Sequence, residues 1–245
     1  SAVTNYRREL NIQTGIASTE FDYKNVSYKR EHFVSAPDNV MVTRMTASKK
    51  GKLSVDISMT LNNSALAGVT SLDEKNHTYT IDGNVKANGL KFRTTMQIVP
   101  VGGTITADTE ENVYHVEDAD SIMIVMAEET NYVNNYPNYL DTEKDLAGIV
   151  DGRTLKCGAM DYKELKERHV ADHQGLFDRV SLDLGERLPN IPTNELVDAY
   201  RNGEYSTYLE VLSFQYGRYL SIAGSRGDLP SNLNGMWTIG ASGWS

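Results

Sequence analysis

The residues best suited to binding a ligand gather near the carboxyl end of the chain, in SRGDLPSNLNGMW, residues 225–237. Asn232 and Asn234 carry amides that both donate and accept hydrogen bonds. Trp237 and Trp244 carry flat apolar rings that suit the C–H face of a sugar. We take these four residues as substrate-binding candidates, although residue types alone favour a structural role in loop backbone and a domain interface.

His169 and His173 are four residues apart, a spacing that places both imidazoles on one side of a helix, as in metal sites. A zinc-protease helix carries Glu directly after its first His, but here Val170 follows. Cys157 is the sole cysteine, which excludes a cysteine-based zinc site and an intramolecular disulfide. We therefore expect no metal and no cofactor. We expect both histidines and Asp172 to form hydrogen bonds across a helix interface.

Carboxylates are frequent before the middle of the chain, at Glu110, Glu111, Glu117, Asp118 and Asp120. Hydrolysis of a glycosidic bond needs two carboxylates roughly 5 to 9.5 Å apart. No pair in the sequence stands out, and we expect most of these groups to lie on a solvated loop or strand edge. Phosphate-binding glycine loops, nucleophile elbows and Cys/His signatures are absent from the sequence.

Tyr132, Tyr136 and Tyr139 form an aromatic stretch that could serve as a platform for a sugar. The alternative, which we favour from the sequence, is that these rings pack under a linker. The platform belongs to a second hypothesis for the whole chain, a non-catalytic β-sandwich module that binds carbohydrate or packs against a partner domain.

The composition is that of a globular protein: of 245 residues, 40% are hydrophobic and 23% are charged. A net charge of −9 argues against binding nucleic acid through a basic face. No apolar run approaches the roughly 20 residues of a membrane span. We therefore expect neither a nucleic-acid partner nor a membrane span.

Alternating apolar and polar residues predict antiparallel strands over residues 1 to about 130, with clear examples at 53–61 and 90–98. Residues 121–127 are apolar on both faces, which predicts a strand buried on both sides. Asp82-Gly83 predicts a two-residue hairpin turn, and Gly102-Gly103 predicts another turn. This succession favours an antiparallel sandwich.

Residues 131–160 show no clear period and are predicted to be irregular. A helical period follows Asp161 and continues to Phe177. Residues 179–185 resemble a short strand. Thr193 is expected to cap a short helix that ends at Asn202-Gly203.

The strongest helical pattern runs from about Ser206 to Ala223. Its apolar stripe includes Leu209, Leu212, Tyr216 and Tyr219. If this stripe were left uncovered, it would promote self-association or docking onto the sandwich.

Four separated stretches resemble glycoside hydrolase family 95, the inverting α-L-fucosidases. YRRELNIQTGIASTEF (6–21) and YKREHFVSAPDNVMVTRMTAS (28–48) are similar to that family's N-terminal β-domain. YKELKERHVADHQGLFDRVSLDLG (162–185) resembles its linker. PTNELVDAY (192–200) and FQYGRYLSIAGSRGDLPSNLNGMW (214–237) resemble the entry into its helical barrel.

The resemblance implies a mainly β fold, an antiparallel super-sandwich, followed by an α-helical linker and the first helix of an (α/α)6 barrel. The corresponding divisions are 1–150, 151–203 and 204–245. It also implies release of α-linked L-fucose, typically α-1,2-linked, with inversion. In such enzymes a Glu protonates the leaving oxygen, and Asn side chains with an Asp activate the attacking water. A secreted, periplasmic or cell-surface location is implied as well.

The family's acid and its Asn pair are expected beyond Ser245, so the resemblance assigns no catalytic residue here. Asn232 and Asn234 match the N-L-x-G-x-W loop and not the catalytic Asn pair. Thr238 and Gly243 differ from the residues that many relatives carry beside the two tryptophans. The chain thus resembles a fragment, inactive by itself, whose partners are a fucosylated glycan and the rest of its own barrel.

Two neighbouring activities stay open. Some proteins with the same sandwich-and-barrel layout are other sugar hydrolases or phosphorylases, and some family members prefer L-galactosides.

Overall fold

The computed structural model describes residues 2–227 and 231, which fall into two compact units. The first unit comprises residues 1–10 and 16–169, and the second comprises 11–15 and 170–245. The division lies inside helix α2 (Tyr162–Phe177), directly after His169.

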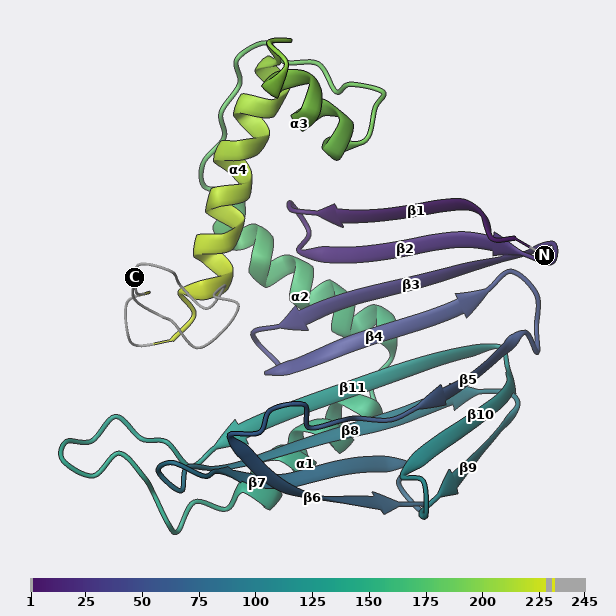
Figure 1. The fold of residues 1–245 in the computed structure, drawn as a ribbon, viewed down its shortest axis with the longest axis vertical. Helices are drawn as coiled ribbons and strands as arrows, with labels where there is room; N and C mark the ends of the chain where they lie inside the picture. The colour runs from purple at the N-terminus through teal and green to yellow at the C-terminus, as the bar shows by residue number, and fades with distance from the viewer. Residues whose placement is uncertain (1, 228–230, 232–245) are drawn as a thin grey trace. The chain divides into compact units, whose positions relative to one another are not determined.

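The strands form two sheets (Figure 1). They are β1 (Thr4–Asn11), β2 (Ile16–Tyr23), β3 (Val26–Ser35), β4 (Val40–Ala47), β5 (Leu53–Ile57), β6 (Leu66–Asp73), β7 (Thr78–Val85), β8 (Lys91–Val101), β9 (Thr104–Asp108), β10 (Val113–Ala119) and β11 (Ser121–Thr130). The larger sheet has the order β1-β2-β3-β4-β11-β8-β7-β6, and the smaller has the order β5-β10-β9. Every pairing from β2 to β6 in the larger sheet is antiparallel, as are both pairings in the smaller.

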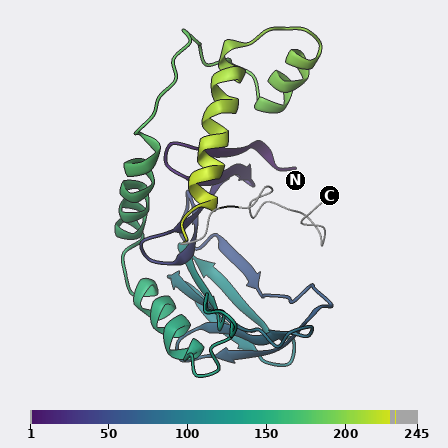
Figure 2. The same ribbon diagram turned by 90° about the vertical axis from the view of Figure 1, so that its left-hand side faces the viewer.

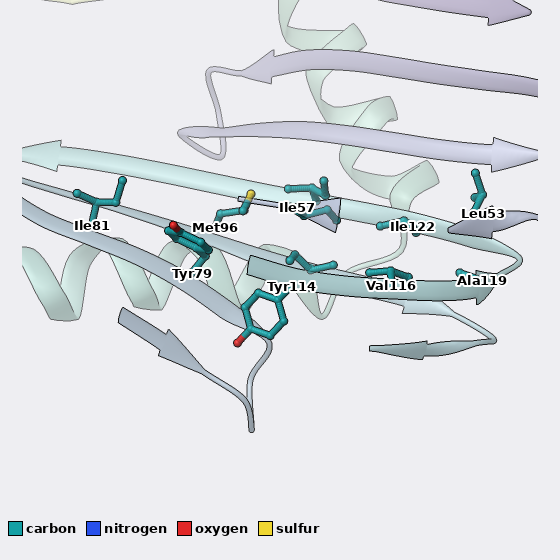
Figure 3. Close-up of a cluster of buried hydrophobic side chains, with 11 residues drawn as sticks. Leu53, Ile57, Tyr79, Ile81, Met96, Tyr114, Val116, Ala119 and Ile122 are labelled. Carbon is teal, nitrogen blue, oxygen red and sulfur yellow. The ribbon is translucent and has the colours of Figure 1, made fainter. Parts of the chain in front are cut away.

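The main core lies between the two sheets (Figure 3). The smaller sheet contributes Leu53, Ile57, Tyr114, Val116 and Ala119, and the larger contributes Tyr79, Ile81, Met96, Ile98, Ile122 and Ile124. Alternation in β5 and β8 puts one set of side chains into this core, as their sequences predict. The fold is therefore the mainly β sandwich that the alternating patterns indicate.

Helix α1 (Leu146–Gly158) covers the opposite face of β8 and β11 (Figure 2). Met123, Val125 and Ala127 of β11 are buried there, while Ile122 and Ile124 face the core between the sheets. The prediction that residues 121–127 are buried on both sides is thus confirmed. Thr154 donates a hydrogen bond to the carbonyl of Thr95, joining α1 to β8.

The first half of α2 is held on β3. Tyr162 donates a hydrogen bond of 2.9 Å to Glu31, and Lys166 donates one of the same length to the other oxygen of that carboxylate. Burial acts to raise the pKa of Glu31, but these hydrogen bonds outweigh it and hold the pKa below its usual value. The imidazole of His169 stacks on Phe33, with ring centroids 4.7 Å apart.

The second unit contains the rest of α2 together with α3 (Thr193–Arg201) and α4 (Thr207–Gly224). Ser206 caps α4 by accepting a hydrogen bond from the amide of Leu209, which explains where this helix begins. The bounds predicted for α2 and α4 agree with the structure to within one residue. In the described part of the chain, no helix is long and apolar enough to cross a membrane.

Asp82-Gly83 is not a hairpin turn, contrary to its sequence signal, because both residues lie inside β7. A Cβ on residue 83 would lie 2.3 Å from the ring of Phe92 and 2.5 Å from the carbonyl oxygen of Ala67. Glycine is therefore needed here for close packing across the sheet and not for a turn. The turn at Gly102-Gly103 is confirmed, since both residues have φ near +70°.

Three other local predictions were also wrong, two about helices and one about a strand. Residues 131–160 are not irregular throughout, because α1 occupies residues 146–158. Residues 179–185 contain no strand. Thr193 is the first residue of α3 and not its cap; Pro192 precedes it and makes no side-chain capping bond.

Candidate functional site

The four substrate-binding candidates, Asn232, Asn234, Trp237 and Trp244, lie outside the described residues. The structure does describe Ser231, which directly precedes Asn232, and it describes the end of α4, from which this segment departs. The candidate site is therefore built from the residues around the carboxyl end of α4.

Ser231 binds the carboxyl end of α4, with Ser225 as its second partner. The hydroxyl of Ser231 donates a hydrogen bond of 3.1 Å to the carbonyl of Gly224, one of the groups that a helix end leaves without a partner. Its oxygen lies 2.9 Å from the hydroxyl of Ser225, which must then be the donor. The residue before Asn232 is thus fixed to the end of the helix.

Arg226 forms an ion pair with Asp172 of α2. Their side chains are about one-third exposed, so the pair is partly screened from water. Together with Leu176, Ser221, Ile222 and Ser225, Arg226 lines an open hollow of about 480 Å³, which we call the α4 pocket. The hollow is shallow and widely open to solvent, so these residues could contact only one side of a ligand.

Arg218 connects the middle of α4 to the end of α2. Its guanidinium donates hydrogen bonds to the carbonyls of Phe177, at 2.7 Å, and Val180, at 2.8 Å. It also bonds Gln215 and lies over the Phe177 ring, 4.8 Å from the centroid. Because Phe177 is the last residue of α2, this side chain binds a helix end and fixes α4 beside it.

His173 lies in the same unit as the α4 pocket. Its Nε2 is 2.8 Å from the carbonyl oxygen of Ile12, which can only accept, so Nε2 carries the proton. Its ring stacks on Phe177 and meets Tyr219 edge to face. His169 and His173 are both buried, and both lie against aromatic rings. Among residues 2–227 and 231, no group of three His, Cys, Asp or Glu side chains could hold a metal ion.

The carboxylates between residues 110 and 120 lie in or directly beside β10 of the smaller sheet. Glu110, Glu111, Glu117 and Asp118 are exposed. Asp120 accepts a hydrogen bond of 2.8 Å from the amide of Gly51. Their placement on turns and strand edges confirms the expectation that most of them are solvated.

Tyr132, Tyr136 and Tyr139 come together in an exposed cluster within the first unit. The rings of Tyr132 and Tyr139 are parallel to within 2°, with centroids 6.2 Å apart, and Tyr136 meets Tyr139 at 72°. Tyr136 is 83% exposed. In the described part of the chain these rings are not packed under a linker.

The sequence pointed to the segment of the site but did not reveal its supports. Arg226 lies within residues 225–237, and Asp172 was expected to bond across a helix interface. Their pairing spans 54 residues, and no local pattern encodes it. Arg218 was not identified as an anchor, because a single Arg in an amphipathic helix has no distinguishing sequence signal.

Two family comparisons cover most of the chain. Residues 1–135 match the family described as glycosyl hydrolase family 65, N-terminal domain. Residues 161–244 match the glycosyl hydrolase family 95 catalytic domain. The second match contains the whole α4 pocket and the four substrate-binding candidates.

Curated relatives agree with these matches. The chain is 30% identical over 261 residues to "Alpha-L-fucosidase 2" of Arabidopsis thaliana, covering 95% of this chain and 30% of that protein. It is 30% identical over 259 residues to "Probable alpha-fucosidase A" of Aspergillus niger, covering 100% of this chain and 32% of that protein. The chain therefore spans about a third of the length of these relatives.

A solved structure shares the fold. "Putative kojibiose phosphorylase from human microbiome" superposes with a TM-score of 0.53 at 8% identity, covering 72% of this chain and 25% of that one. At this identity the likeness concerns the fold alone.

Proposed function

Since the chain belongs to glycosyl hydrolase family 95, with an N-terminal domain of the family 65 type, we propose that it is part of an enzyme that releases α-linked L-fucose from glycans. The observation that carries this proposal is the family 95 catalytic match over residues 161–244. The relatives named as fucosidases support the choice of fucose over L-galactose.

The proposed reaction is inverting hydrolysis, with α-1,2-linked fucose as the preferred substrate. A carboxylic acid protonates the leaving oxygen while a water attacks the opposite face of the sugar. The acid and the group that activates the water must be far enough apart to leave room for that water. None of the described residues that line the α4 pocket is a carboxylate, and the nearby Asp172 is paired with Arg226. We therefore assign no catalytic residue in the described chain.

We assign substrate binding to Asn232, Asn234, Trp237 and Trp244. The support for this is Ser231, which directly precedes Asn232 in the sequence and bonds Gly224 and Ser225 at the end of α4, where Ser225 lines the α4 pocket. Amides can bond sugar hydroxyls, and indole rings can cover an apolar sugar face.

The proposed organisation has three parts: a sandwich domain (1–150), a helical linker (151–203) and the start of a helical barrel (204–245). The remaining barrel helices of the same protein are the proposed partner of α4. Phe214 and Tyr216 on α4 are exposed, which supports either that packing or self-association of the 245-residue chain.

The test compares the 245-residue chain with the same protein extended through its complete helical domain. We expect the extended protein to release fucose from 2′-fucosyllactose, with the β-anomer appearing first in proton NMR, and the 245-residue chain to release none. In the extended protein, Trp237→Ala should raise KM about tenfold, since it removes an aromatic surface from bound sugar. An extended protein that leaves the fucosyl bond intact would refute the proposal, and so would retention of configuration.

A further inference from the structure

The first part of the loop between β11 and α1 presents an aromatic surface without charged side chains, and the charged residues of this loop begin at Asp141. Residues 131–140, NYVNNYPNYL, contain three Tyr and four Asn and no charged side chain. By contrast, 23% of the whole chain is charged. Asn134, Asn135 and Asn138 are exposed together with the three tyrosines. We call residues 131–140 the tyrosine loop.

Both ends of the tyrosine loop are held by backbone hydrogen bonds. Tyr132 and Leu140 form an antiparallel bridge, and the amide of Val133 donates to the carbonyl of Tyr139 at 3.0 Å. The amide of Asp141 donates to the carbonyl of Asn131 at 2.8 Å. These bonds fix the backbone that carries Tyr132 and Tyr139, so little ordering is required when a ligand binds.

Asn131 ties the loop to the sheet. It is 2% exposed, and its side-chain oxygen accepts a hydrogen bond of 2.8 Å from the amide of Lys91, at the start of β8. The backbone N–H of Asn131 donates a second hydrogen bond, of 3.1 Å, to the backbone carbonyl of Lys91. The loop therefore projects from a rigid base, which is the arrangement that favours a binding surface.

The side chains of the loop match a neutral, polyhydroxylated ligand. Parallel rings such as those of Tyr132 and Tyr139 offer apolar faces, and a tyrosine loses little conformational entropy on binding. The amides of Asn134, Asn135 and Asn138 supply donors and acceptors without charge. A charged ligand would find no ion partner in residues 131–140, whereas a pyranose ring presents both a C–H face and hydroxyls.

We propose that the tyrosine loop is a binding site for neutral oligosaccharides, with Tyr136 and Tyr139 in contact with the sugar. This proposal goes beyond fucose hydrolysis and does not depend on it, because the ligand need not contain fucose. Tyr136 is the leading contact residue since it is the most exposed of the three. Tyr132 positions Tyr139 through their parallel packing.

The first test uses the 245-residue chain with isotope-labelled tyrosine rings. Cellotetraose, lactose and 2′-fucosyllactose are added in turn, and ring signals are assigned with single Tyr→Phe variants. We expect shifts at Tyr136 and Tyr139 with at least one sugar, while exposed Tyr205 does not shift. Each sugar is added up to about 50 mM, so that binding with a dissociation constant in the millimolar range would be detected. If all three sugars leave these signals unchanged, the proposal is wrong.

The second test compares variants. Tyr136→Ala should weaken sugar binding about fivefold or more, whereas Tyr136→Phe, which keeps the ring, should retain it within about threefold. Tyr205→Ala is the matched control, because Tyr205 is 73% exposed and lies outside the loop. Equal affinity in Tyr136→Ala and the wild type would overturn the proposal. Loss of self-association in Tyr136→Ala without any sugar binding would assign the loop to a protein contact instead, and would overturn it too.

Discussion

Arg226, just after α4, is paired with Asp172 of α2, so the segment that leads to Asn232 begins from a charged contact between two helices. The pair also forms part of the wall of the α4 pocket through Arg226. Because both side chains are partly exposed, we expect the pair to contribute little to stability.

Removing that pair is expected to change local order more than global stability. Arg226→Ala should lower the free energy of unfolding by less than about 1 kcal/mol. It should nevertheless speed hydrogen exchange at the amides of residues 225–227, which hydrogen–deuterium exchange would measure. Arg187→Ala, at an exposed arginine of the same unit, is the control and should change neither quantity. Unchanged exchange in Arg226→Ala would mean that the ion pair does not hold this segment.

Arg218 should matter more, because it binds two carbonyls at the end of α2 and covers the Phe177 ring. We expect Arg218→Ala to lower the free energy of unfolding by about 2 to 3 kcal/mol in urea denaturation. Arg218→Lys should recover only part of this, since a single ammonium cannot reproduce the forked geometry. Arg179→Ala is the matched control, because within the described residues the side chain of Arg179 makes one hydrogen bond, to the carbonyl of Gly175. Equal losses for Arg218→Ala and Arg179→Ala would contradict the anchoring role.

Substitutions at Gly103 and Gly89 distinguish two costs of replacing glycine, an unfavourable backbone conformation and a steric clash of the added Cβ. Both have positive φ, +67° and +73°, but only Gly103 is crowded. A Cβ there would lie 2.1 Å from the carbonyl oxygen of Glu117 and 2.6 Å from the backbone nitrogen of Ala119, whereas nothing lies within 4 Å at Gly89. Gly89→Ala should cost about 1 kcal/mol from the backbone conformation, and Gly103→Ala about 3 kcal/mol or more. Thermal unfolding of both variants would show this difference, and similar melting temperatures would refute it.

Local patterns predicted the elements whose packing follows a simple period. Alternation located β5 and β8, a short run that is apolar on both faces located the doubly buried β11, and the three-to-four spacing located α2 and α4. In these elements the apolar residues of the pattern are the residues that are buried. The local sequence is therefore enough to predict each element.

Helix α1 could not be predicted in this way. Three glycines, Gly148, Gly152 and Gly158, weaken its helical propensity and obscure its period. The helix is secured by partners far away in the sequence, since Asp151 accepts hydrogen bonds from Arg93, at 2.8 and 3.0 Å, and from Thr95, at 2.8 Å. Gly83 was misread for the same kind of reason, because the Phe92 ring that covers it belongs to another strand. The supports of the candidate site, the Arg226–Asp172 pair among them, likewise join residues that no local pattern links.

Glu31 should make the stability of the first unit depend on pH in the acid range. Its pKa in the folded protein is held below its usual value of 4.5 by hydrogen bonds from Lys166 and Tyr162, against the opposing effect of burial. A carboxyl whose pKa is lower when folded stabilises the protein above its unfolded pKa. This contribution is therefore complete above about pH 4.5 and is lost as the pH falls through the lowered value.

Glu31→Gln tests this origin of acid sensitivity. In urea denaturation from pH 7 to pH 2.5, the wild type should lose stability below about pH 4.5 more steeply than Glu31→Gln, because the variant has no proton to take up at this site. Tyr162→Phe should reduce the slope in part, since Lys166 still bonds the carboxylate. Glu128→Gln, at an exposed position on β11, is the control and should keep the wild-type slope. If Glu31→Gln and Glu128→Gln follow the same curve, the acid sensitivity has another source.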